Sequence, residues 1–105
     1  MSLRHLVLLR FKAEASATDI AGIEFAFTAL KHQIDVIRDI EWGTDVSPEG
    51  LSQGYTHAFL LTFDNAADRD RYLPHPAHQV FVTQLQPLIE QVLVIDYQAA
   101  SSSLH

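Results

Sequence analysis

The sequence predicts a single α+β domain with elements in the order β–α–β–β–α–β. Three observations support this class. Four segments rich in β-branched and aromatic residues are too short for buried helices. Two longer segments repeat apolar residues at helical spacing. The chain has 105 residues, 48% hydrophobic and 19% charged, which suits one ordinary globular domain. Such an order predicts an antiparallel four-stranded sheet with helices on one face.

The first predicted strand is residues 4–12, RHLVLLRFK. Side chains alternate between the two faces of a strand, so His5, Val7 and Leu9 share one face while Leu6 and Leu8 share the other. Both faces are apolar, and the strand should therefore be covered on both sides.

The first predicted helix lies within residues 15–34. Ser16 or Thr18 can cap it, and Asp19 places negative charge in its first turn. Its buried stripe is Ile20, Ile23, Phe27, Leu30 and Ile34.

The middle of the chain predicts two further strands. Residues 36–46 form the second, and the loop SPEGLSQG follows it. Residues 55–63, YTHAFLLTF, form the third, with His57 and Phe59 on one face.

The last part of the chain predicts a split helical region and a final strand. A short helix begins at DNAADRDRYL and should stop near Leu73, because Pro74 and Pro76 restrict the residues before them. A new helix starts after Pro76, and Pro87 kinks it or begins a fresh turn. VLVIDYQ is the fourth strand, so the domain spans residues 1–98, with a loose tail at 99–105. The complete order is typical of a ferredoxin-like fold.

Composition excludes several classes of function. The net charge of −6 disfavours nucleic acid as a partner. No apolar run approaches the roughly 20 residues of a membrane span, and the N-terminus lacks the features of a signal peptide. The absence of cysteine excludes disulfides and suits a cytoplasmic protein.

A homodimer is predicted because the strands are apolar on both faces. The helices cover only one face of the sheet, and Leu6, Leu8, Ala58 and Leu60 lie on the other. Soluble monomers rarely expose such a patch, so we expect a second copy to pack sheet to sheet.

Three histidines and one tyrosine suggest a binding site for a small ligand. His5 and His57 point toward the helices, where unpartnered polar groups are costly. We expect them to form the floor of a small-ligand cavity roofed by Tyr72 and His78. Its apolar walls would be Val7, Leu9, Phe27, Phe59 and Val94. The other interpretation is that these are core histidines bonded to the backbone.

Three chemistries can use a site of this kind. His78 can remove a proton from an activated carbon acid, with Tyr72 orienting it or donating to an oxyanion. A metal bound by His75-x-x-His78 with His5 or His57 has weak support, and we expect neither metal nor cofactor. Nucleophilic catalysis has little support, since there is no cysteine and no serine elbow. His75 is expected to help build the turn.

The segments RHLVLLRFK, WGTDVSPEGLSQGYTHAFLLTF, YLPHPAHQVF and VLVIDY together resemble the stress-responsive A/B barrel (Dabb) family over about residues 3–98. The resemblance implies a ferredoxin-like protomer and a homodimer whose two sheets form a dimeric α/β barrel. A plant polyketide cyclase branch uses a Tyr and a His that match Tyr72 and His78, with cavity histidines matching His5 and His57. Three functions stay open: a homodimer that binds a small organic ligand without assigned role, a cyclase-like proton-transfer enzyme, or a cofactor-free monooxygenase-type barrel.

Overall fold

The four strands form one antiparallel sheet in the order β2-β3-β1-β4. In this computed structural model, which describes residues 2–100, the strands are β1 (Leu3–Phe11), β2 (Asp39–Thr44), β3 (His57–Phe63) and β4 (Ile89–Gln98). The helices are α1 (Ala17–Gln33), α2 (Ala66–Tyr72) and α3 (Pro76–Leu85), and a 3-10 turn, Gln86–Leu88, precedes β4. The predicted ferredoxin-like order is confirmed. Most of the expected tail at 99–105 lies outside the described residues.

Local chemistry sets the helix boundaries. Ser16 caps α1 through a capping box, because its hydroxyl accepts from Asp19 N at 3.0 Å and the Asp19 carboxylate accepts from Ser16 N at 3.3 Å. Asn65 caps α2 by accepting from Asp68 N at 2.9 Å. The expected role of Pro87 is also confirmed, since α3 ends at Leu85 and a separate 3-10 turn follows.

The two prolines of YLPHPAHQVF separate α2 from α3 as predicted. Helix α2 ends at Tyr72, and α3 begins at Pro76, whose ring takes the first helical position. His75 caps α3, because its Nδ1 accepts from Ala77 N at 3.0 Å. The prediction that His75 helps build the turn is therefore confirmed.

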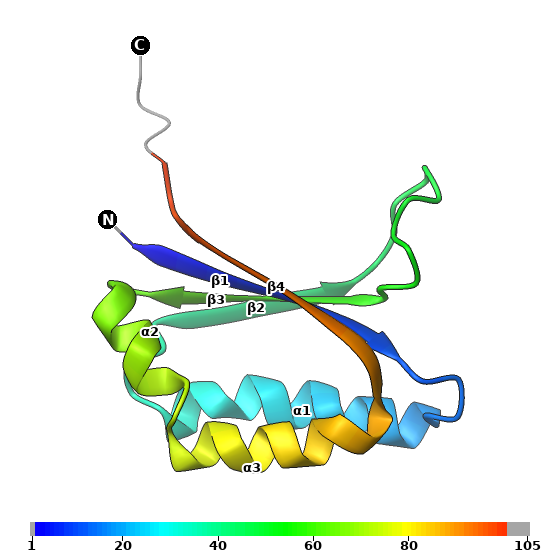
Figure 1. Cartoon of the computed structure of the whole chain (residues 1–105), viewed down its shortest axis with the longest axis horizontal. Coiled ribbons are helices and arrows are strands. Elements are labelled where there is room, and N and C mark those ends of the chain that lie inside the picture. The colour runs from blue at the N-terminus through cyan, green and yellow to red at the C-terminus, as the bar shows by residue number, and fades with distance from the viewer. Residues whose placement is uncertain (1, 101–105) are drawn as a thin grey trace.

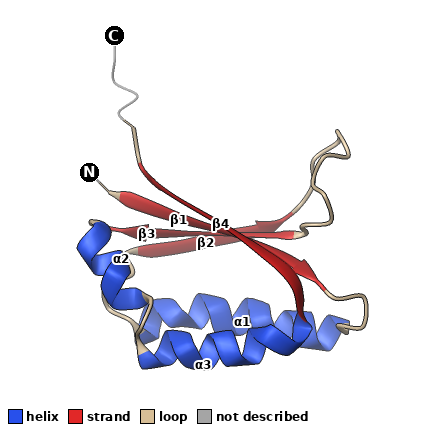
Figure 2. Cartoon of the chain, viewed as in Figure 1, coloured by secondary structure: helices blue, strands red, loops and turns tan. Residues whose placement is uncertain are grey.

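The helices all lie on one side of the sheet (Figures 1 and 2). Alternate residues of β1 and β3 are buried against them, and the core between the layers includes Phe27, Leu30, Phe59 and Phe81. Among residues 2–100, no helix combines the length and apolar character that crossing a membrane requires.

The opposite face of the sheet is apolar and uncovered. In the register of the strands, Leu6 lies between Leu60 and Ile95, and Leu8 lies between Ala58 and Leu93. Ile95 is 49% exposed and Leu93 is 40% exposed. Strand β4 is also an edge strand, and its apolar side chains are exposed on both faces.

The loop between β2 and β3 is held by Arg10. This loop projects beyond the sheet on the side away from the helices (Figure 1). The Arg10 guanidinium donates to Gln53 O at 3.2 Å and to Gln91 Oε1 at 2.9 Å, and it lies 5.8 Å from the centre of the Tyr55 ring. Gly54 has a φ of +84°, and a Cβ there would lie 2.7 Å from Arg10 Cδ.

We therefore expect Gly54→Ala to destabilise the fold by about 2 kcal/mol, because it combines a strained φ with a clash against a tethered side chain. Gly50→Ala is the matched control, since Gly50 has a φ of +70° but open space around its Cβ position. It should cost only about 1 kcal/mol. Urea unfolding of the three proteins measures both values, and equal losses would show that Arg10 does not restrain Gly54.

Candidate functional site

Three of the predicted site residues form one cluster where β1 meets α2 and α3. Tyr72 is the last residue of α2 and is only 1% exposed. Its ring centre lies 4.3 Å from that of His78 and 5.7 Å from that of His5. Phe63 completes the surroundings at 5.3 Å from the Tyr72 ring. The structure thus brings Tyr72, His78 and His5 together.

The proton on His78 is fixed by its hydrogen bond. His78 Nδ1 lies 2.8 Å from Leu73 O, and a carbonyl can only accept, so Nδ1 carries the hydrogen. In the neutral ring, Nε2 is then left with a free lone pair. Burial lowers the pKa of His78. Electrostatic interaction with His5 and His75 also lowers it, whereas the hydrogen bond to Leu73 O raises it. The neutral, basic form is therefore favoured at pH 7.

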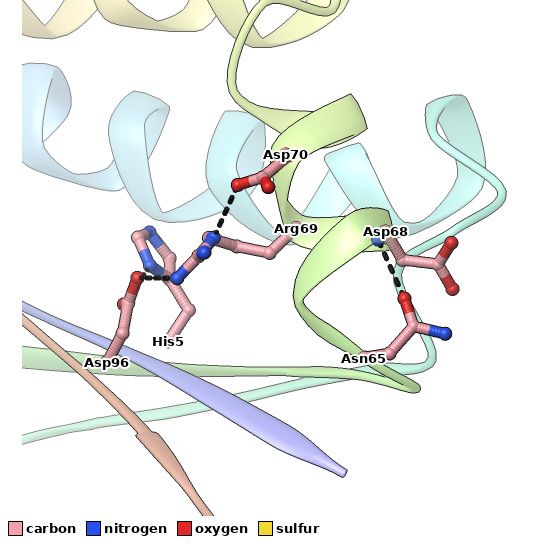
Figure 3. Close-up of polar contacts among 6 residues, drawn as sticks. All are labelled: His5, Asn65, Asp68, Arg69, Asp70 and Asp96. Carbon is pink, nitrogen blue, oxygen red and sulfur yellow. Dashed lines mark hydrogen bonds and ion pairs between the residues drawn. The ribbon is translucent and has the colours of Figure 1, made fainter.

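His5 is the first member of a charged chain that joins three elements (Figure 3). His5 Nδ1 lies 2.6 Å from Asp96 Oδ1 on β4, and Asp96 Oδ2 accepts from Arg69 of α2 at 2.8 Å. Arg69 Nε also donates to Asp70 at 3.0 Å. The buried imidazole is thus satisfied by a side chain rather than by the backbone, and α2 is tied to the edge strand.

His57 lies at the other end of the sheet. Leu9 pairs with His57 and His5 pairs with Leu61, so the two histidines are four strand positions, or roughly 13 Å, apart. His57 Nε2 lies 2.7 Å from Glu24 Oε2 of α1, and its Nδ1 lies 2.8 Å from Thr56 Oγ1. The expected floor of one shared cavity is therefore divided into two separate sites.

Aromatic side chains fill the space between these ends. Phe27 stacks on Phe59 with ring centres 4.2 Å apart and contacts Phe81 at 4.6 Å. Val7 and Leu9, the other expected cavity walls on β1, are buried in the same core. Val94 lies opposite Val7 in the register but is 48% exposed, because the helices do not extend over β4.

Two hollows lie elsewhere on the surface. One, of about 500 Å³, runs between α1 and α3, with Phe25 and Val80 on its walls. The other, of about 420 Å³, lies beside the β2–β3 loop and is lined in part by Thr56 and His57. Neither hollow is lined by Tyr72 or His78.

The histidines do not converge on a metal site in the part of the chain that the structure describes. In residues 2–100 no group of three His, Asp or Glu side chains is placed to hold an ion. His75 and His78 instead bind the turn between α2 and α3, through Ala77 N and Leu73 O respectively.

Comparison with known proteins identifies the family. The family model described as "Stress responsive A/B Barrel Domain" matches residues 3–99. The chain belongs to the stress-responsive A/B barrel (Dabb) family. It is 39% identical to the Arabidopsis thaliana stress-response A/B barrel domain-containing protein HS1 over 101 residues, which is 96% of this chain and 93% of that protein. It is 31% identical to olivetolic acid cyclase of Cannabis sativa over 97 residues, covering 92% of this chain and 96% of the cyclase.

Solved structures agree with this assignment. The hydroxynitrile lyase from Passiflora edulis superposes with a TM-score of 0.90 at 28% identity, covering 96% of this Dabb chain and 95% of the lyase. A dimeric ferredoxin-like protein of unknown function from Jannaschia sp. has a TM-score of 0.82 at 26% identity, covering 94% of this chain and all of that one.

Sequence reasoning missed the carboxylates that serve the two buried histidines of this Dabb domain. Asp96 is an acidic residue inside the apolar run VLVIDY, and that interruption was a usable signal. Glu24 gave a weaker one, because many surface helices carry glutamates beside their buried stripe. Arg69 gave none, since it lies in the charged segment DRDR.

We expect Asp96→Ala to lower the free energy of unfolding by about 2 kcal/mol, because it leaves buried His5 without its carboxylate partner and removes one of the two carboxylates that accept from Arg69. Asp64→Ala is the matched control. Asp64 accepts from Arg38 at 2.6 Å, but both side chains are about half exposed, so its loss should cost clearly less stability than the loss of Asp96. Denaturant unfolding at pH 7 measures both, and equal costs would contradict a structural role for the chain His5–Asp96–Arg69.

Proposed function

We propose that this Dabb protein acts as a homodimer and uses Tyr72 and His78 to transfer a proton on a small carbonyl-containing or hydroxynitrile compound. The observation that carries the proposal is the hydrogen bond from His78 Nδ1 to Leu73 O. It leaves Nε2 as a base beside the Tyr72 ring, whose centre is 4.3 Å from that of His78.

The surroundings of Tyr72 complete this proton-transfer pair. Burial raises the pKa of the Tyr72 phenol far above neutrality, so its O–H stays protonated and can donate to a developing oxyanion. His78 is only partly buried, whereas Tyr72 and His5 are almost fully buried. A substrate would therefore approach from the side of His78, with its polar group toward Tyr72.

The names of two relatives favour chemistry of this kind. One is called a cyclase and the other a hydroxynitrile lyase, and both align with nearly the whole chain. Neither name fixes the substrate of this protein. General acid–base chemistry next to a carbonyl or hydroxyl group is what a neutral histidine and a protonated tyrosine can supply together.

Support for the homodimer comes from the uncovered sheet face. Leu6, Leu8, Leu60, Leu93 and Ile95 form a continuous apolar surface on the sheet. Exposure of such a patch is costly, and an isologous contact between two copies would cover it. The described fold offers no helix on that side (Figure 2).

Ile95→Glu tests the dimer. A carboxylate at the centre of a sheet-to-sheet contact would lose its hydration, so we expect the dimer dissociation constant to rise by at least ~100-fold. Val80→Glu is the matched control, because Val80 is 61% exposed on α3, in the opposite layer. Light scattering across a dilution series measures both; an intact Ile95→Glu dimer would exclude this face.

His78→Ala tests the base. Using a panel of small hydroxynitriles and poly-β-keto thioesters, we expect kcat/KM to fall by at least ~100-fold, while Tyr72→Phe loses about 10-fold. His32→Ala, on the exposed last turn of α1, should leave the rate unchanged. Equal rates for wild type and His78→Ala would remove His78 from the mechanism.

The pH dependence should carry the signature of His78. Its pKa is lowered below the ordinary 6.5, so the base is unprotonated at neutral pH, and kcat/KM should be level there. The rate should fall as the pH drops below this lowered pKa. A rate that rises steadily between pH 7 and 9 would indicate a different base.

A further inference from the structure

The outer surface of the helical layer carries a hollow beside an exposed aromatic ring. Helices α1 and α3 run side by side in opposite directions, in the layer away from the uncovered face of the sheet (Figure 1). The hollow of about 500 Å³ lies between them, and Ile23, Leu30 and Phe81 contribute to its lining. Phe25 also lines it and is 76% exposed. A protruding ring and an apolar depression therefore occur together on one face.

The charged side chains of the two helices are engaged elsewhere. On α1, Glu24 and Lys31 bond to side chains of the sheet, and Asp19 bonds to the backbone of the N-cap residue. On α3 and the turn that follows it, no residue from 76 to 88 is Asp, Glu, Lys or Arg. In a chain that is 19% charged, the outer face of these helices is thus unusually neutral.

Gly22 keeps the hollow open at a cost to α1. It lies in the interior of the helix, where glycine is less favourable than alanine. A Cβ at this position would meet nothing from another element within 4 Å, so packing within the chain does not require glycine. Gly22 and Ala26 both line the hollow and leave room there for a side chain from outside.

Charge decides which kind of partner fits this face. Two copies of a chain with a net charge of −6 repel each other, so a contact between copies favours surfaces without charge. The outer face of α1 and α3 meets this condition. Helix α2 does not, since it carries Asp68, Arg69, Asp70 and Arg71. A strongly basic or acidic partner would gain little from the hollow, because its only charged lining residue, Asp19, is bonded within the helix cap.

We propose that this face binds the same face of a second copy, with the Phe25 ring of each copy in the hollow of the other. A two-fold contact requires a surface that is complementary to itself, and a ring beside a hollow is such a surface. The contact lies in the opposite layer from the proposed sheet-to-sheet dimer, so the two contacts are independent. Because that dimer has a helix face on each outer side, association through the helices extends in steps of one dimer.

The size of the face predicts a weak contact. Helix α1 has 17 residues and is therefore about 25 Å long. Packed helices lie about 10 Å apart, so the pair makes a face of roughly 500 Å² in each copy. Twice this area is below that of stable interfaces and within the range of transient ones. Association should therefore appear only at high protein concentration, and the Phe25 ring should supply much of its free energy.

Sedimentation equilibrium of the full chain tests the contact. We expect the average mass of the wild type to rise above that of the dimer at high protein concentration. The rise should grow with added salt, because salt screens the repulsion between two negative copies and weakens no ion pair within the contact. A wild-type mass that stays at the dimer at every concentration overturns the proposal.

Two substitutions separate a specific contact from non-specific association. Phe25→Ala should weaken the association at least ~10-fold. Gly22→Leu fills the hollow and should weaken it to a similar extent, while raising the urea midpoint of unfolding, because leucine favours a helix more than glycine does. Ala13→Leu, at an exposed turn outside the hollow, is the matched control and should associate like the wild type. Equal association of the wild type and Gly22→Leu overturns the proposal.

The double variant Phe25→Ala/Gly22→Leu tests whether the ring occupies the hollow. It should associate little more weakly than either single variant, because both changes remove the same contact. Losses that add in full would show that the Phe25 ring of one copy does not lie in the hollow of the other.

Ile95→Glu keeps this test distinct from that of the sheet-to-sheet dimer. A chain that no longer pairs through its sheet should still pair through its helices and reach the mass of two chains at high concentration. Val80→Glu should show the opposite pattern: it keeps the sheet-to-sheet dimer, but a carboxylate in the lining of the hollow weakens the helix contact. An Ile95→Glu chain that is monomeric at every concentration would contradict the helix contact.

Discussion

The structure depends on one constraint: the central strand β1 is apolar on both faces. It pairs with β3 on one side and with β4 on the other, so its register sets which residues of the whole sheet face the helices. Leu9 at full burial requires His57 on the same face, and Val7 requires His5 there. The two buried histidines are placed by this alternation, because period-two geometry leaves no freedom to turn one of them outward.

Burial of two imidazoles then determines contacts far from β1. Each needs a partner that stays close, and each takes a carboxylate from another element: Asp96 for His5 and Glu24 for His57. Asp96 is shared with Arg69, so the same carboxylate that satisfies His5 also fixes the orientation of α2. Because Tyr72 ends α2, the position of the Tyr72 ring against His5 follows from a charge pair on the edge strand.

The sequence was sufficient for the fold because local signals and periodicity agreed. Alternation identified β1 and β3, and the two prolines around His75 fixed the ends of α2 and α3. Shared faces were also predictable, which is why His5 and Tyr72 were expected to meet. The distance between two residues along one face of the sheet was not predictable in this way. Strand alternation predicts that His5 and His57 face the same side of the sheet. It does not reveal that Phe27 and Phe59 stack in the space between them. Glu24 and Asp96 were missed because their role depends on pairing between remote elements.

The aromatic side chains Phe27, Phe59 and Phe81 separate the two buried histidines, and this separation affects which ligands each end of the sheet can contact. Ligands at the two ends of the sheet would contact different side chains, and the two histidine centres would share no proton, since Phe27, Phe59 and Phe81 offer no polar bridge. At one end His78 is partly buried and donates to Leu73 O, and at the other His57 lies between Glu24 and Thr56. A neutral imidazole held by a carbonyl suits transfer of a substrate proton. The two histidines thus differ in their bonding because their partners, rather than their burial, decide which ring nitrogens are engaged: both in His57 and Nδ1 in His78.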